Sequence, residues 1–114
     1  MSPKGNPSKK QGGGQGDDVA VETRTKKKLQ KPRLYKVLLH NDNYTPMEFV
    51  VSLLRGVFHK SESDAAAIML HAHTHGRAVA GVYSFEIAEE KVARVTSLAE
   101  EAQFPLLSTL EPED

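Results

Sequence analysis

Three consecutive polar side chains, Asn41, Asp42 and Asn43, offer amide and carboxylate oxygens that suit the binding of a small cationic or polar group. Asn and Asp are also the ordinary residues of turns, where their side chains bond the local backbone. These residues alone therefore leave two interpretations open, a recognition site and a simple turn. A second set of residues, from elsewhere in the chain, is needed to decide between them.

Histidines alternate at His71, His73 and His75, and imidazole nitrogens are common zinc ligands. On a helix His71 and His75 share a face while His73 points roughly opposite, so three ligands do not converge. We expect no metal and no cofactor, and keep a histidine-based metal-binding module as an alternative function. His73 has a second interpretation, as a core histidine satisfied by a hydrogen bond.

Signals for catalysis are sparse. The chain has no cysteine, no Gly-rich phosphate loop and no serine with a clear histidine and acid beside it. Asp42 and His73 could act as an acid–base pair, but a chain of 114 residues offers little space for a substrate cleft around them. We predict that the protein is not an enzyme.

The polar corner is followed by a well-marked helix start. Thr45 can cap the helix, Pro46 suits its first position, and Glu48 stands where it can bond back to the Thr45 NH. An apolar run over residues 35–39 predicts a strand that leads into the corner. Strand and helix together are expected to hold the corner residues in fixed positions.

Further elements follow from periodicity and caps. We predict strands over residues 34–39, 78–83 and 104–110, and helices over about 46–59, 61–75 and 84–101, with Gly76 as a left-handed cap. In the last helix, Ile87, Val92, Val95 and Leu98 fall near one face and are expected in the core. The order β-α-α-β-α-β predicts a small α+β sandwich with a three-stranded antiparallel sheet and three helices, the helices on one face.

Net charge is zero, but it is unevenly distributed. Residues 1–33 carry nine Lys or Arg and three acids, whereas residues 34–114 carry six and twelve. Residues 1–31 are rich in Gly, Lys, Ser and Gln, and we predict a disordered basic extension there, with a core domain over 32–114. A basic-arm nucleic-acid-binding protein is a second alternative, which the acidic body disfavours. No apolar run is long enough to cross a membrane, and we expect a cytoplasmic location.

Several separated blocks closely resemble the ClpS family in order and spacing. They are NDNYTPMEFV (41–50), IMLHAH (68–73), GVY (81–83), AEEKV (88–92) and FPLL (104–107), and the resemblance spans about residues 32–112. ClpS proteins are bacterial adaptors that bind proteins with a destabilising N-terminal residue and hand them to a Clp AAA+ unfoldase and its protease. The resemblance implies that the corner belongs to a pocket, which decides against the turn-only interpretation.

The resemblance also implies roles for individual residues. Asn41 and His73 would hold the α-amino group of the substrate, with Asp42 and Asn43 supplying further polar contacts. The pocket that receives a Leu, Phe, Tyr or Trp side chain would be lined by Leu39, His40, Thr45, Met47, Val50, Met69, Ala72 and Leu106. Glu86 and Lys91 would dock the N-terminal domain of a ClpA-like unfoldase, and the N-terminal extension would be engaged during delivery. A monomer is expected.

Three positions depart from the family pattern. The family commonly has an acidic residue at Asn43, an apolar one at His40 and Val at Ala72. These changes remove a carboxylate near the amino group, make the rim more polar and enlarge the pocket wall. The resemblance therefore implies an adaptor, or a paralogue of it, with shifted preference.

Overall fold

The computed structural model describes residues 32–114. The elements follow the order β2 (Leu34–His40), α2 (Met47–Gly56), α3 (Glu62–His75), β3 (Arg77–Ser84), α4 (Phe85–Ala102) and β4 (Leu107–Pro112). Their types and order confirm the predicted α+β fold with three strands and three helices. The extension predicted over residues 1–31 lies outside the described residues.

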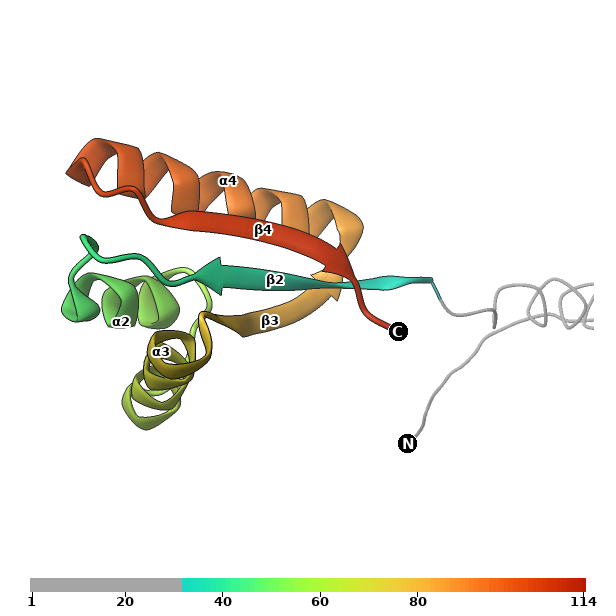
Figure 1. The fold of residues 1–114 in the computed structure, drawn as a ribbon. Helices are drawn as coiled ribbons and strands as arrows, with labels where there is room; N and C mark the ends of the chain where they lie inside the picture. The colour runs from blue at the N-terminus through green and yellow to red at the C-terminus, as the bar shows by residue number, and fades with distance from the viewer. Residues whose placement is uncertain (1–31) are drawn as a thin grey trace, which may run out of the picture. The chain divides into compact units, whose positions relative to one another are not determined.

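The sheet has the order β3-β2-β4, and both pairs are antiparallel. Figure 1 shows α4 running along the sheet, with α2 and α3 gathered at the end where β2 stops. The register shifts between Val37 and Leu38, because Val37 pairs with Gly81 while Leu38 pairs with Val79. Ala80 is therefore the extra residue of a β-bulge, which bends β3.

Alternation along β2 divides the sheet into two faces. Val37 and Leu39 are fully buried in a single hydrophobic core. Helix α4 contributes Ala88, Val95 and Ala99 to the same core, and these small side chains let the helix approach the strands closely. The core is completed by buried residues of α2, of the segment after it and of α3, namely Leu53 and Leu54, Val57 and Phe58, and Ala65.

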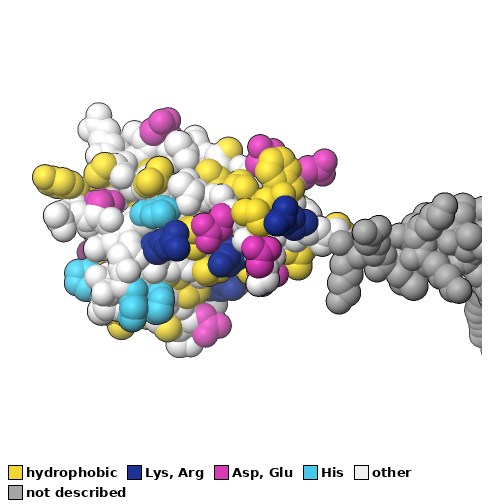
Figure 2. All heavy atoms as spheres, turned by 45° about the vertical axis from the view of Figure 1, so that its right-hand side comes forward, with side chains coloured by type: hydrophobic (Ala, Val, Ile, Leu, Met, Phe, Trp, Pro, Cys, Tyr) yellow, Lys and Arg dark blue, Asp and Glu magenta, His cyan; other side chains and the backbone are white. Residues whose placement is uncertain are grey.

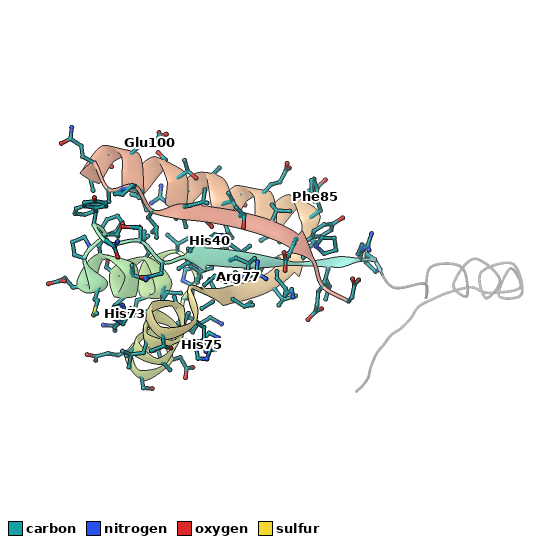
Figure 3. All side chains as sticks on the ribbon, in the orientation of Figure 1. His40, His73, His75, Arg77, Phe85 and Glu100 are labelled. Carbon is teal, nitrogen blue, oxygen red and sulfur yellow. The ribbon has the colours of Figure 1, made fainter. Side chains whose placement is uncertain are left out.

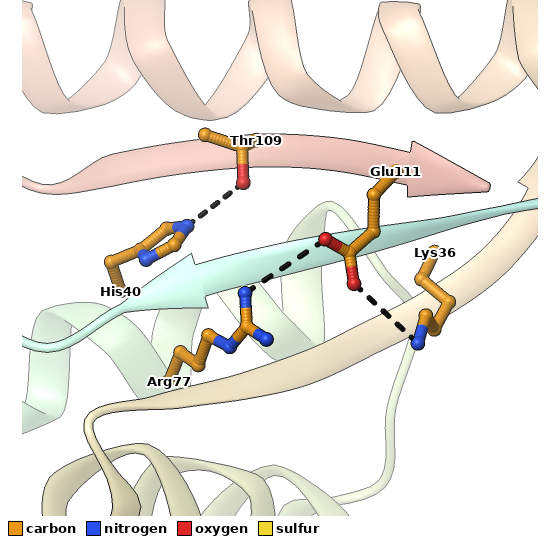
Figure 4. A network of polar contacts seen from close by, with 5 residues as sticks. All are labelled: Lys36, His40, Arg77, Thr109 and Glu111. Carbon is orange, nitrogen blue, oxygen red and sulfur yellow. Dashed lines mark hydrogen bonds and ion pairs between the residues drawn. The ribbon is translucent and has the colours of Figure 1, made fainter. Parts of the chain in front are cut away.

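The opposite face of the sheet carries a network of polar side chains on both sides of the buried Leu38. Glu111 of β4 pairs with Lys36 of β2 at 3.5 Å and with Arg77 of β3 at 3.8 Å, as Figure 4 shows. His40 Nε2 lies 2.8 Å from Thr109 Oγ1 on the same face. In Figure 2 acidic and basic side chains lie intermingled over the sheet, with hydrophobic side chains beside them.

Both ends of α3 are as predicted. The Ser61 hydroxyl accepts a hydrogen bond from the Asp64 NH at 3.1 Å and caps the helix. Gly76 ends the helix in the left-handed region with φ +92°, and its NH donates to the Ala72 carbonyl. The cap residues at both ends of α3 act on the neighbouring backbone, which explains why the sequence alone was sufficient to predict where this helix begins and ends.

The prediction for α2 was wrong at both ends. Thr45 does not cap the helix, because its hydroxyl donates to Asp42, and Pro46 occupies the N-cap position without a side-chain bond. The helix ends at Gly56 and does not reach His59, which adopts a positive φ of 57°. The Lys60 NH then bonds the Leu54 carbonyl, so the chain turns there towards α3.

Two further predictions need correction. The last strand begins at Leu107 and not at Phe104, because Gln103 turns the chain with φ 64° and the Phe104 ring packs edge-on against Phe49. Ile87 was expected in the core but is 45% exposed. Ala88 takes the inward position in that turn of α4. Among residues 32–114, no helix is both long enough and apolar enough to cross a membrane.

Candidate functional site

Asp42 organises the corner between β2 and α2. Its Oδ1 accepts hydrogen bonds from the NH groups of Tyr44, at 2.8 Å, and Thr45, at 2.7 Å. Its Oδ2 accepts from the Thr45 hydroxyl at 2.7 Å. This is an Asx-type turn, in which the carboxylate replaces the capping box expected from Thr45 and Glu48.

These bonds also set the charge state of Asp42. Partial burial on its own would raise the pKa of the carboxyl group. The hydrogen bonds from the Thr45 hydroxyl and from the NH groups of Tyr44 and Thr45 favour the ionised form and together hold the pKa below its usual value of 3.8. Asp42 is therefore an anion at neutral pH, and it is bonded to the turn.

A second backbone contact ties the corner to α3. The Asn41 NH donates to the Gly76 carbonyl at 2.8 Å, immediately after the last residue of the helix. His73 lies in the last turn of that helix, so this bond brings the two residues to one end of the fold. His73 is exposed, and the interpretation of it as a core histidine is wrong.

A cavity of about 350 Å³ lies between these elements. All of the residues predicted for the amino-group site and the hydrophobic pocket line it: Asn41, Asp42, Asn43 and His73, together with Leu39, His40, Thr45, Met47, Val50, Met69, Ala72 and Leu106. Their joint position was expected only from the family resemblance. The structure brings them together from three separate stretches of the chain, which are residues 39–50, residues 69–73 and Leu106.

Tyr44 and Pro46 also line the cavity and were not predicted. Tyr44 is 77% exposed, so its ring stands at the edge of the hollow. Both residues belong to the NDNYTPMEFV block, and their sequence proximity to Asn43 and Thr45 was a signal that could have identified them. Composition gave no such signal, because exposed Tyr and Pro are ordinary in a turn.

The cavity has a buried floor and a polar mouth. Leu39, Ala72 and Leu106 are buried and form the apolar floor. Asn41 and His73 are exposed at the mouth, and Met47, 45% exposed, lies at the rim. Among residues 32–114, no Lys or Arg lines the cavity, and Asp42 supplies its one carboxylate. Such a site favours a ligand with one cationic end and one apolar end.

His40 lines the cavity but has a partner of its own. Its Nε2 lies within hydrogen-bond distance of Thr109 Oγ1 on the outer face of the sheet, as Figure 4 shows. The neighbouring Arg77 is paired with Glu111. The ring is thus anchored to β4, beside an ion-pair network.

The two residues expected to dock an unfoldase lie in different surroundings. Glu86 is exposed in the first turn of α4 and lines a shallow hollow with Ile87 and Leu110. The Lys91 ammonium donates to the Val57 carbonyl at 2.7 Å and stands 5.6 Å from the centre of the Tyr83 ring. Lys91 instead lines another hollow, with Val57 and Arg94, and it has a structural contact.

The alternatives gain no support from the described part of the chain. Within residues 32–114, no group of three or more His, Cys, Asp or Glu side chains is placed to hold a metal ion. The Asp42 carboxylate bonds the turn and forms no hydrogen bond with His73 in this part of the chain, contrary to an acid–base pair. The basic arm lies outside the described residues.

Known proteins match most of this chain. A family model described as the ATP-dependent Clp protease adaptor protein ClpS matches residues 30–109. The ClpS adaptor of Myxococcus xanthus is 56% identical over 96 residues, which cover 84% of this chain and 90% of that protein. The ClpS adaptor of Phenylobacterium zucineum is 56% identical over 98 residues, which cover 86% and 90%.

A solved structure is also similar. It is that of ClpS2 from Agrobacterium tumefaciens bound to L-phenylalaninamide, with 49% sequence identity and a TM-score of 0.71. The match covers 73% of this chain and 100% of that one. On the family model, the curated relatives and this structural match, the chain belongs to the ClpS family of ATP-dependent Clp protease adaptor proteins.

Proposed function

We propose that residues 32–114 form an adaptor core that binds the first residue of proteins beginning with Leu, Phe, Tyr or Trp. The adaptor then presents the bound protein to a ClpA-like AAA+ unfoldase. The observation that carries this proposal is the single cavity in which Asn41 and His73 stand at the mouth above an apolar floor. Hydrolysis is left entirely to the partner protease.

The polar mouth of the cavity suits a free N-terminus. A free α-amino group is a cation with several N–H donors, and the Asn41 side-chain oxygen and a neutral His73 imidazole are acceptors. Each hydrogen bond from a charged donor contributes about 1.5 to 3 kcal/mol. The ionised Asp42 adds a negative potential nearby, while its own oxygens remain bonded to the turn.

The floor suits a large apolar side chain. Moving such a group from water into the cavity contributes about 1.5 to 3 kcal/mol. Met47 at the rim and Met69 in the wall are flexible enough to adapt to aromatic and aliphatic shapes. The ligand of the similar ClpS2 structure supports this assignment, because L-phenylalaninamide has a free α-amino group and a phenyl side chain.

The first test compares free and N-acetylated peptides. Fluorescence anisotropy would measure the affinity of the protein for a set of peptides that are identical except for their first residue. Free peptides that begin with Leu, Phe, Tyr or Trp are expected to bind at least tenfold more tightly than those that begin with Ser or Glu. Acetylation is expected to abolish binding, because it removes both the charge and the donors.

Equal affinity for the free and acetylated forms of the Phe peptide would refute the role given to Asn41 and His73. Equal affinity for Phe and Ser as first residues would refute the role of the cavity floor. Each outcome can occur without the other, so the polar mouth and the apolar floor are tested independently.

A further inference from the structure

Two histidines of α3 form a pair that the proposed function does not use. His71 and His75 are one helical turn apart, and both are exposed. Their ring centroids are 4.1 Å apart and the ring planes differ by 14°, so the imidazoles are stacked. His73, which lies between them in sequence, lines the cavity on another side of α3, and Figure 3 shows His73 and His75 on different sides of the helix.

The tautomer of His75 is fixed by its neighbours. Its Nδ1 lies 2.9 Å from Thr74 Oγ1 and 3.3 Å from the His71 carbonyl oxygen. The Thr74 hydroxyl can donate its one hydrogen to the Leu70 carbonyl, 3.0 Å away, and a carbonyl can only accept. Nδ1 of His75 therefore carries the proton, and the lone pair lies on Nε2.

This arrangement is the one found around metal-binding histidines. A metal-ligating imidazole ordinarily donates its other ring NH to a backbone carbonyl or a similar acceptor, which fixes the ring and makes the ligating nitrogen more basic. In His75 that outer bond is already in place. For His71, no hydrogen bond of the ring occurs within residues 32–114, so either of its nitrogens can turn towards a shared ion.

We propose that His71 and His75 form a two-histidine chelate for an exchangeable divalent transition-metal ion, with Cu²⁺ bound more tightly than Ni²⁺ or Zn²⁺. Metal–nitrogen bonds of about 2.0 to 2.1 Å place two ligating nitrogens roughly 3 Å apart. A bound metal lies in the plane of each imidazole, so both exposed rings must rotate out of the stack to share an ion, which their spacing of one helical turn allows. Neutral imidazole suits these ions, and the order of affinities follows the Irving–Williams series.

Position on the helix adds to the site. His75 is the last residue of α3, where the unpaired carbonyls give the helix end a partial negative charge that favours a cation. The nearest basic residue in sequence, Arg77, is paired with Glu111, which offsets part of its charge. Two protein ligands leave the other coordination positions to water, so the site differs from a closed structural zinc site.

The site is independent of the amino-group pocket. His73 faces the cavity, and His40 is bonded to Thr109 on the sheet, so neither joins the pair. An ion bound here would clamp the last turn of α3. That turn leads to Gly76, whose carbonyl holds the Asn41 NH. The expected effect is a higher melting temperature without a change in peptide specificity.

Isothermal titration of the full chain with CuCl2 in a non-coordinating buffer at pH 7.5 tests the proposal. A site of one-to-one stoichiometry is expected, and His71→Gln or His75→Gln should weaken it at least tenfold. Both positions are exposed on a helix and Gln is a good helix former, so the variants are expected to fold. His73→Gln serves as the matched control and should leave the copper affinity unchanged.

Thr74→Val provides a second test, because it removes the nearer of the two acceptors of the His75 Nδ1 proton and leaves only the His71 carbonyl, 3.3 Å away. We expect a severalfold loss of copper affinity with both imidazoles still present. Selective broadening of the His71 and His75 proton resonances by substoichiometric Cu²⁺ would locate the ion. Unchanged affinity in His71→Gln and His75→Gln, or an equal loss in His73→Gln, would overturn the proposal.

Discussion

At the scale of single residues, Asp42 and His73 show two different ways of serving one site. Asp42 is bonded through both carboxylate oxygens to the turn that follows it. His73 is exposed at the mouth of the cavity. We therefore expect His73 to act directly on a ligand and Asp42 to act mainly through the position of its neighbours.

The expected outcome for His73→Ala is a loss of peptide affinity of tenfold or more, because one charge-assisted hydrogen bond disappears. Thermal stability should hardly change, since the side chain is exposed. Anisotropy titrations measure the affinity and thermal melts measure the stability, and an unchanged affinity in His73→Ala would remove His73 from this role.

Asp42→Asn tests the turn. The carboxyl pKa is lowered in the folded protein, so the ionised form stabilises the fold above the unfolded value and this contribution is lost as the pH falls through the folded pKa, below 3.8. We expect the variant to be less stable by about 1 kcal/mol at pH 7.

The measurement is urea unfolding at pH 7 and pH 3, and the difference between the two proteins should shrink at the lower pH. A difference that stays constant would show that the charge of Asp42 does not support the turn.

The residues that line the cavity could be predicted from the sequence only because it resembles the ClpS family. They did not reveal the bonding of Asp42, because a turn carboxylate and a ligand carboxylate are the same residue type. The contact of Lys91 with the Val57 carbonyl was equally hidden, since the two residues are 34 positions apart.

At the scale of elements, helix ends with a local signal were predicted well. Ser61 and Gly76 bound α3 as expected. The errors occurred where a tertiary contact competed with a local preference: Thr45 bonds Asp42 in place of a helix NH, and Phe104 packs on Phe49 in place of joining a strand. Ile87 was misplaced because Ile87 and Ala88 are neighbours and both lie close to the apolar face of the helix. The structure buries the smaller Ala88 and leaves Ile87 exposed.

Two glycines allow a controlled test of the end of α3. A Cβ added at Gly76 or at Gly56 would meet no atom within 4 Å, but only Gly76 has a positive φ, of 92°. Gly76→Ala should therefore destabilise the protein by about 1 to 2 kcal/mol. Gly56→Ala, at the end of α2, should be neutral or stabilising by up to about 1 kcal/mol.

Chemical denaturation of both variants measures this difference. We also expect Gly76→Ala to weaken peptide binding, because the Gly76 carbonyl holds the Asn41 NH. Equal stability of the two variants would show that the backbone at residue 76 relaxes to another conformation.

At the scale of the whole molecule, the cavity and the surfaces of α4 are separate regions of the described part of the chain. The cavity involves no residue of α4, whereas Glu86 and Lys91 both lie on it. Substrate binding and partner docking are therefore expected to be separable by mutation.

Glu86→Ala and Lys91→Ala should both reduce delivery of a Phe-initiated reporter to a ClpA-like unfoldase with its protease, while peptide affinity is retained. Only Lys91→Ala should also lower the melting temperature, because its ammonium bonds the Val57 carbonyl and Glu86 is exposed. Degradation assays and thermal melts distinguish the two effects. Unimpaired delivery with both variants would place the docking surface elsewhere.

The cavity draws its floor and its mouth from different parts of the fold. Ala72 and Leu106 belong to α3 and to the segment before β4, whereas Asn41 belongs to the corner that Asp42 holds. A substitution in the floor, such as Val at residue 72, alters the shape available to a guest without disturbing that corner. If the proposed site is correct, paralogues of this protein can thus diverge over evolutionary time in the first residue that they accept while all of them keep the same contacts for the α-amino group.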